Sequence, residues 1–187
     1  MQMNESELTN LLGSLRHMGS DDLNVEVKES AATLSRDVWE TVSAFANTAG
    51  GIIVLGVSER AGFVPVENFE TEKVLNQFVS GMGDAGGRGK LTNPPKYTIE
   101  RVELQGVIVL VITIEELDPS SKPCYVIERG AQGGSYKRID DKDVPLSSTE
   151  VLALASYGRT TPSDRDAVPG ASADDLDETL VDRTIDR

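Results

Sequence analysis

The chain has 187 residues, of which 18 are basic and 31 acidic, so its formal net charge at pH 7 is −13. This balance argues against non-specific binding to nucleic acid or to an anionic membrane, although a local basic patch remains compatible with it. The single cysteine, Cys124, excludes an internal disulfide, and no signal peptide or 18-residue apolar segment is visible. We therefore expect a cytoplasmic protein with no membrane partner.

The composition divides the chain into three regions. Leucines at helical spacing predict a helix over residues 5–18, so we assign residues 1–19 to an N-terminal helix. Residues 20–158 carry the mixed helix and strand patterns of one domain. Residues 159–187 are rich in acidic side chains and contain two prolines, which is typical of a solvated linker. We expect this tail to lead toward a further C-terminal domain.

A corner between a helix and a strand lies at the centre of the predicted domain. Apolar residues at helical spacing indicate a helix that starts near Asp37, and residues 52–57 form a continuous apolar run typical of a strand buried on both faces. Between them, Asn47, Gly50 and Gly51 are expected to supply the left-handed backbone angles at which a helix stops and turns.

The remaining elements complete an α/β (α+β) fold. Strands are predicted from apolar or alternating runs at residues 23–28, 62–66, 97–104, 107–114, 125–127 and 135–139. The two long runs are expected to form a hairpin, and the last two short runs another antiparallel pair. Helices are predicted around residues 71–79 and 147–157, the second starting at a capping box of Ser147 and Glu150. We expect a mixed, mostly antiparallel sheet with helices packed on it.

Several short motifs match the sequence patterns of nucleotide-binding sites but lack the structural context or the residues that those sites need. Residues 81–86 satisfy a dinucleotide fingerprint but follow a helix, whereas the motif needs a strand that leads into a helix N-terminus. Gly89 and Lys90 look like part of a phosphate-binding loop, but Leu91 replaces the metal-binding hydroxyl. His17 is the only histidine and has no recognisable catalytic partner. We therefore expect no ATP site and no cofactor. We interpret residues 81–95, the glycine-rich stretch with glycines at 81, 83, 86, 87 and 89, as a flexible loop.

A group of cationic side chains lies late in the chain and alternates with two tyrosines around a glycine turn. This late rim consists of Lys122, Tyr125, Arg129, Tyr136, Lys137 and Arg138. Such an arrangement suits a phosphate backbone and base stacking. The letters alone favour the alternative, a solvated hairpin whose long side chains lie along its surface.

An acidic group consists of Asp21, Glu26 and Glu59, with Glu29 nearby. These carboxylates would gather around a divalent cation if the strand at residues 23–28 lies beside the central strand. A chain with 31 acidic residues also produces such groupings by chance. Spacing alone therefore predicts no metal, and Mg²⁺ or Mn²⁺ enters only with a nuclease alternative.

An ordered series of motifs resembles the Schlafen AlbA-type domain, also called AlbA_2 and formerly divergent AAA. The series comprises residues 25–29, Trp39, and residues 43–57, 122–125 and 134–138. The resemblance covers roughly residues 20–155. It implies a mixed α/β domain that binds nucleic acid and is common at the N-terminus of bacterial proteins described as transcriptional regulators.

The resemblance also assigns expected roles to single residues. The strand-end lysine of the family corresponds to Lys28, its helix-to-strand signature to Asn47, Gly50 and Gly51, and its Tyr-x-Arg motif to Tyr136 and Arg138. In animal Schlafens three acidic residues form a ribonuclease site, and their positions fall near Asp21, Glu26 and Glu59. Aspartate and glutamate are exchanged at the outer two positions, and a shift of one methylene argues against metal-dependent cleavage.

Three functions follow as hypotheses. The first is a nucleic-acid-binding module of a transcriptional regulator, with DNA favoured over RNA and contacts from Lys28 and the late rim. The second is a metal-dependent, Schlafen-like ribonuclease that uses the acidic group. The third is a protein-interaction module, suggested by the net charge of −13. The sequence leaves the oligomeric state open, and a homodimer is one alternative.

Overall fold

The computed structural model describes residues 3–18 and 24–160 of the chain. Its elements, in chain order, are α1 (Glu5–Met18), β1 (Val25–Lys28), α2 (Val38–Asn47), β2 (Gly51–Leu55), β3 (Val57–Ser58), β4 (Val64–Pro65), α3 (Thr71–Met82), β5 (Leu91–Thr92), β6 (Tyr97–Leu104), β7 (Val107–Ile114), η1 (Pro119–Ser121), β8 (Tyr125–Val126), η2 (Ile127–Arg129), α4 (Gly130–Gly134), β9 (Tyr136–Ile139), β10 (Lys142–Pro145) and α5 (Ser148–Thr160). The predicted acidic tail from residue 161 onward lies outside the described residues. Within the described ranges, no helix is both long and apolar enough to cross a bilayer.

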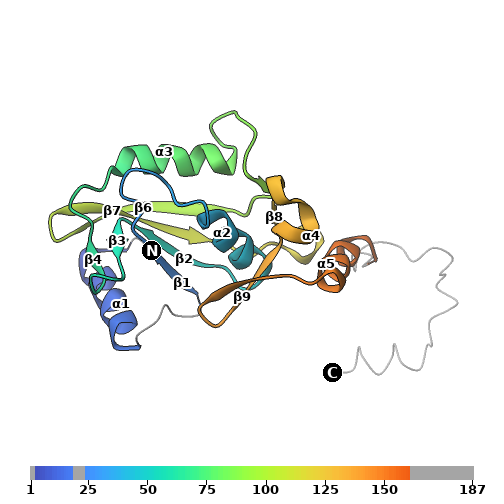
Figure 1. Cartoon of the computed structure of the whole chain (residues 1–187), viewed down its shortest axis with the longest axis horizontal. Coiled ribbons are helices and arrows are strands. Elements are labelled where there is room, and N and C mark those ends of the chain that lie inside the picture. Colours follow the sequence, from blue (N-terminus) through green and yellow to red (C-terminus); the bar gives the residue numbers. More distant parts are fainter. Residues whose placement is uncertain (1–2, 19–23, 161–187) are drawn as a thin grey trace, which may run out of the picture.

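The central sheet has four strands in the order β1-β2-β7-β6. β1 runs parallel to β2, whereas the β2–β7 and β7–β6 pairs are antiparallel. Helix α1 packs on one face of this sheet, and α2 and α3 pack on the other (Figure 1). The predicted mixed, mostly antiparallel sheet with helices packed on it is therefore confirmed.

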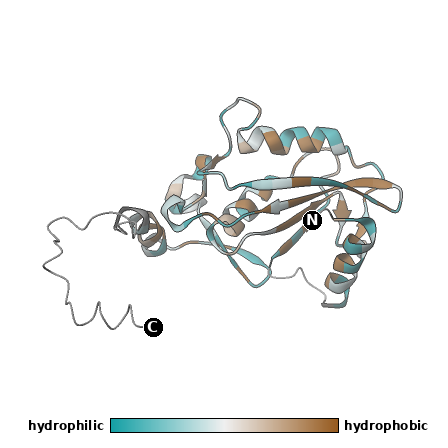
Figure 2. Cartoon of the chain, turned by 180° about the vertical axis from the view of Figure 1, so that it is seen from behind, coloured by the Kyte–Doolittle hydropathy of each residue, from teal (hydrophilic) through white to brown (hydrophobic). Residues whose placement is uncertain are grey.

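The core consists of two apolar layers, one on each face of the sheet. In β2, Ile53 and Leu55 belong to the layer under α2 and α3, and Val54 belongs to the layer under α1. Because a strand presents alternate side chains to opposite faces, burial on both faces requires the continuous apolar run that the sequence shows. Figure 2, from behind, shows the central strands mainly in the brown of hydrophobic residues.

The corner between α2 and β2 uses one left-handed residue, not three. Gly50 has a φ of 70°, whereas Asn47 is the last residue of α2, and neither Asn47 nor Gly51 has a positive φ. The expectation of left-handed angles at Asn47 and Gly51 was therefore wrong. A Cβ on Gly51 would lie 2.6 Å from the ring of Phe45, so this glycine allows close packing. Gly56, with a φ of 92°, separates β2 from β3 and divides the predicted single strand.

The late part of the chain pairs differently from the prediction. β8 pairs with β5, and β9 pairs with β10, both antiparallel. A single bridge between Tyr125 and Ser135 joins the two segments that were expected to form one hairpin. The reason is that residues 130–134 form the short helix α4 in place of a turn. The glycine-rich stretch, interpreted as a flexible loop, contributes β5 to this arrangement.

Candidate nucleic-acid interface

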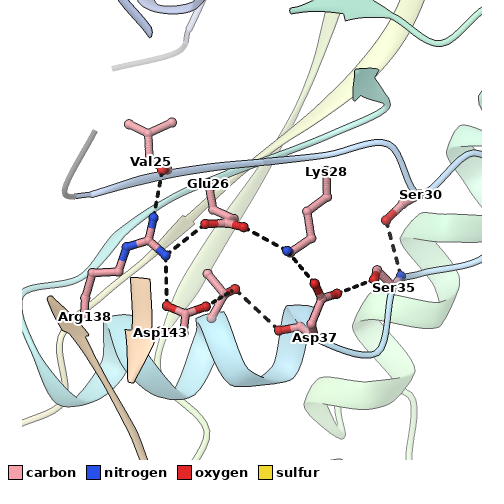
Figure 3. A network of polar contacts seen from close by, with 9 residues as sticks. Val25, Glu26, Lys28, Ser30, Ser35, Asp37, Arg138 and Asp143 are labelled. Carbon is pink, nitrogen blue, oxygen red and sulfur yellow. Dashed lines mark hydrogen bonds and ion pairs between the residues drawn. The ribbon is translucent and has the colours of Figure 1, made fainter. Parts of the chain in front are cut away.

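Arg138 of the late rim points into the molecule. Its side chain is 1% exposed, and Nη1 lies 2.9 Å from both Glu26 Oε2 and Asp143 Oδ1. Nη2 donates to the carbonyl of Val25 at 3.2 Å, and the guanidinium lies over the ring of Phe45, 5.3 Å from its centroid. Figure 3 shows Arg138 at one end of this network, between β9 and β1. Arg138 therefore connects two parts of the fold and presents almost no surface to a ligand.

The network continues through Lys28, the strand-end lysine. Lys28 Nζ lies 2.8 Å from Glu26 Oε1 and 2.8 Å from Asp37 Oδ2 (Figure 3). Burial disfavours the charged ammonium, but hydrogen bonds with Asp37 and Glu26 outweigh it and raise the pKa of Lys28. Asp37 precedes α2, and its carboxylate binds Lys28 and Ser35 while making no side-chain capping bond. Thr41 donates to Asp143 at 2.7 Å and joins α2 to β10.

Asn47 anchors the segment that follows η1. Its Oδ1 accepts the N–H of Cys124 at 2.8 Å, and its Nδ2 donates to the carbonyls of Cys124 and Tyr136, each at 2.9 Å. Lys122, whose side chain is 8% exposed, donates to the carbonyl of Asn47 at 2.9 Å. The Tyr136 side chain is buried, and burial raises the pKa of the Cys124 thiol to about 12. These residues hold the fold together.

The other members of the late rim are also engaged or partly covered. Arg129 lies 2.6 Å from the carboxylate of Glu40, and Lys137 forms an ion pair with Glu150. Tyr125 in β8 is half-buried. The structure thus brings acidic partners to both of these rim cations, which reduces the positive charge that the rim presents to a phosphate backbone.

The two described members of the acidic group, Glu26 and Glu59, lie in different environments. Both carboxylate oxygens of Glu26 contact cations, Oε1 with Lys28 and Oε2 with Arg138. Glu59 is exposed beside a hollow of about 270 Å³ that Lys28 also lines. Asp21 lies outside the described residues. In residues 3–18 and 24–160, no three His, Cys, Asp or Glu side chains form a group that could hold a metal. A cation at Glu26 would have to compete with two basic side chains.

A cationic groove that the sequence interpretation missed lies beside α3. It has a volume of about 900 Å³. Its lining includes four basic side chains, an apolar floor and three uncharged polar side chains, and we call it the α3 groove. The lining residues are Arg36, Lys73, Arg88 and Lys90, then Leu34, Trp39 and Gly81, then Asn76, Gln77 and Ser80. No acidic residue lines it.

Three separate segments supply the groove cations. Arg36 precedes α2, Lys73 lies in the first turn of α3, and Arg88 and Lys90 lie in the glycine-rich stretch after α3. This stretch returns along the end of α3, because the N–H of Lys90 donates to the carbonyl of Gly81 at 2.6 Å. Backbone contact at this distance places the Lys90 side chain beside the helix. The segment dismissed as an incomplete phosphate-binding loop thus carries two groove cations.

The groove cations are accessible to an anion. Within the described parts of the chain, the side chains of Arg36 and Arg88 make no hydrogen bond or ion pair, and both residues are exposed. Lys73 lies 3.1 Å from Glu70, and Lys90 lies 2.6 Å from Glu128. Both pairs are exposed, and exposed ion pairs contribute only about 0–1 kcal/mol. A phosphate can therefore displace either carboxylate at small cost.

Comparisons with known proteins bear on the fold and the family. The family model described as Schlafen, AlbA_2 matches residues 21–147. The solution structure of the N-terminal domain of a RecG-related protein from Nitrosomonas europaea is similar, with 26% identity and a TM-score of 0.50, over 86% of this chain and 97% of that one. The DIP2311 protein from Corynebacterium diphtheriae aligns with 14% identity and a TM-score of 0.48, over 82% of this chain and 29% of that one. No curated protein shows a significant match.

Proposed function

This chain belongs to the Schlafen AlbA_2 family, and on this premise we propose that it binds nucleic acid through the α3 groove. One observation carries the proposal: a chain with a net charge of −13 gathers four basic side chains around a single groove, and the two of them that pair with carboxylates, Lys73 and Lys90, do so in exposed ion pairs. Elsewhere, the cations of the late rim lie against carboxylates. The α3 groove is therefore the local basic patch that an acidic nucleic-acid-binding protein requires.

The four cations would bind phosphates of the backbone. Each phosphate contact releases condensed counterions, so affinity should fall with salt, with a log–log slope of about −0.7 per contact for a single strand or about −0.9 for a duplex. Four contacts then predict a slope of about −3 to −4. The acidic remainder of the surface repels the backbone and confines binding to the groove.

We further propose that the chain binds DNA in preference to RNA, and that it is a module of a transcriptional regulator. The RecG-related protein whose N-terminal domain is similar carries a name that relates it to an ATP-dependent DNA helicase. That name supports DNA as the first ligand to test. Phosphate contacts alone carry no base sequence, so the module would supply affinity and position, and recognition of a sequence would need further contacts.

The test is fluorescence polarisation of the full chain with labelled single-stranded DNA, duplex DNA and RNA over a salt series. The double variant Arg36→Ala/Arg88→Ala should lose at least tenfold in affinity and flatten the salt slope by about 1.4–1.8, since two contacts are removed. The control Arg16→Ala/Lys142→Ala removes the same charge, from α1 and β10, and should change little. Absence of binding to all three ligands at low salt would contradict the proposal.

The late rim is the competing surface in the same assay. Arg129→Ala/Lys137→Ala removes two positive charges from the rim while leaving the groove intact. If this variant loses the affinity and the groove variant keeps it, binding belongs to the rim. Adding Mn²⁺ and analysing the products on a denaturing gel tests the ribonuclease alternative, in which Glu26→Gln would abolish cleavage.

A further inference from the structure

We propose that the α3 groove accepts an unpaired stretch of nucleic acid, with one nucleobase lying on its apolar floor and the flanking phosphates on its basic rim. This inference rests on the proposed function and adds which form of nucleic acid is bound. A purely electrostatic site needs only cations, whereas this groove also has an apolar floor and uncharged polar groups. The apolar floor matches a base and not a phosphate, and the uncharged polar groups can bind either.

The floor is formed around the only tryptophan of the chain. Trp39 is 8% exposed and stacks on Phe78, with ring centroids 5.6 Å apart and an interplanar angle of 21°. A Cβ on Gly81 would lie 2.1 Å from the Trp39 ring, so only glycine at this position of α3 lets the helix pass so close. Leu34 completes the floor. Phe78 holds the indole in place by stacking on it, and the exposed part of the indole lines the groove.

Uncharged polar groups line the same groove. Gln77 Oε1 accepts the N–H of Leu34 at 2.8 Å, which fixes that amide and leaves its NH₂ group as a donor. The side chains of Asn76 and Ser80 are exposed and make no hydrogen bond within the described ranges. Amide and hydroxyl groups can satisfy the donors and acceptors on the edge of a base that has no pairing partner.

A duplex does not fit this combination. Its bases are stacked and paired, so no base face can lie on the floor unless the base leaves the stack, which has an energetic cost. An unpaired strand exposes its base faces, and stacking on an aromatic ring tolerates every base. The groove volume of about 900 Å³ lies within the range of about 300–1,000 Å³ that small-ligand sites occupy. The site therefore fits one or a few unpaired nucleotides of DNA or RNA.

The experiment uses Trp39 as a reporter, because no other tryptophan contributes to the emission. The full chain is titrated with unlabelled oligo-dT, oligo-U and a blunt duplex of the same length, and intrinsic fluorescence is recorded beside polarisation. We expect the unpaired oligomers to change the Trp39 emission in step with binding and to bind about tenfold more tightly than the duplex. The ratio of oligo-dT to oligo-U affinity separates DNA from RNA as the source.

One variant at the exposed surface of the groove and one at its floor test the inference. Asn76→Ala removes an exposed groove amide and should weaken binding to unpaired oligomers several-fold, whereas Asn10→Ala removes an exposed amide from α1 and should not. Trp39→Phe, if it folds, should reduce the preference for unpaired strands. Equal binding of duplex and single strands, or binding without any change in Trp39 emission, would overturn this inference and leave the proposed function standing. Failure of every ligand to bind would instead contradict the proposed function.

Discussion

Nη1 of Arg138 lies 2.9 Å from Oε2 of Glu26 in β1 and 2.9 Å from Oδ1 of Asp143 in β10. This contact joins residues 112 positions apart and ties the β9–β10 hairpin to the parallel edge strand β1. The side chain of Arg138 is 1% exposed and lies between two carboxylates, so it stabilises the fold and offers almost no surface to a ligand. That position leads to a stability prediction.

We expect Arg138→Ala to lower the free energy of unfolding by about 3–5 kcal/mol, because removing one partner of a buried ion pair leaves its acids uncompensated. Urea denaturation followed by Trp39 fluorescence measures the loss. Arg36→Ala removes the same charge from an exposed site and should change stability by less than about 0.5 kcal/mol. An Arg138→Ala protein of unchanged stability but reduced affinity would show instead that Arg138 contacts nucleic acid, as the sequence predicted.

Asn47 supports a second prediction, which distinguishes an anchor from a turn residue. Asn47→Ala should destabilise the protein by at least about 2 kcal/mol, since the buried N–H of Cys124 and carbonyl of Tyr136 each lose a partner at about 1–3 kcal/mol per group. Asn47→Asp keeps the acceptor for Cys124 but loses both donors, so it should also destabilise. Asn47→Gly would leave the stability unchanged only if the role of Asn47 were to adopt a left-handed backbone angle. Calorimetry of the three variants distinguishes the two roles.

The sequence correctly predicted the elements that depend on residues close together in the chain. Leucines at helical spacing predicted α1, the alternating and continuous runs predicted the β6–β7 hairpin, and Ser147 and Glu150 form the expected capping box, with bonds of 2.8 Å and 3.3 Å. Each of these signals is local. The left-handed angle at the α2 corner was expected at three residues because Asn and Gly both tolerate it, yet Gly50 alone adopts it.

The candidate site was harder to anticipate because long-range contacts decide it. Arg138 looked like one more late cation, and only the return of β9 to β1 buries it against Glu26. The α3 groove joins Arg36 to Arg88, 52 positions later in the chain, and no period or motif connects them. The available signal was the pair of basic residues, Arg88 and Lys90, within a glycine-rich stretch that lets backbone approach a helix closely. This signal points to residues 88–90 as part of a site, but it does not show which other residues line that site.

Glu128 carries a prediction about affinity. Its carboxylate lies 2.6 Å from Lys90, and this hydrogen bond, with the charges of Lys90, Arg36 and Arg129, lowers the pKa of Glu128. The carboxylate occupies a position that a phosphate would take. We therefore expect Glu128→Gln to tighten nucleic-acid binding several-fold at low salt, with the gain shrinking as salt screens the charges.

The control for Glu128 is Glu103→Gln, which makes the same charge change on the exposed surface of β6. Polarisation titrations at two salt concentrations separate a local effect from one of net charge. Equal gains for both variants would assign the effect to the overall charge of −13. Weaker binding by Glu128→Gln would mean that Glu128 positions Lys90 instead of competing for it.

Glu150 gives the last prediction, on the pH dependence of stability. Lys137 and the N–H and hydroxyl of Ser147 bind its carboxylate and lower its pKa from 4.5 to about 2. A carboxylate with a depressed folded-state pKa stabilises the protein above its unfolded pKa, and this contribution is lost as the pH falls through the folded one. The stability difference between the wild type and Glu150→Gln should therefore be constant from pH 6 to 8, shrink below about pH 4.5 and vanish below about pH 2. Urea denaturation of both proteins across this range measures it, and a difference that stays constant down to pH 2 would show that the capping contacts do not depend on the charge of Glu150.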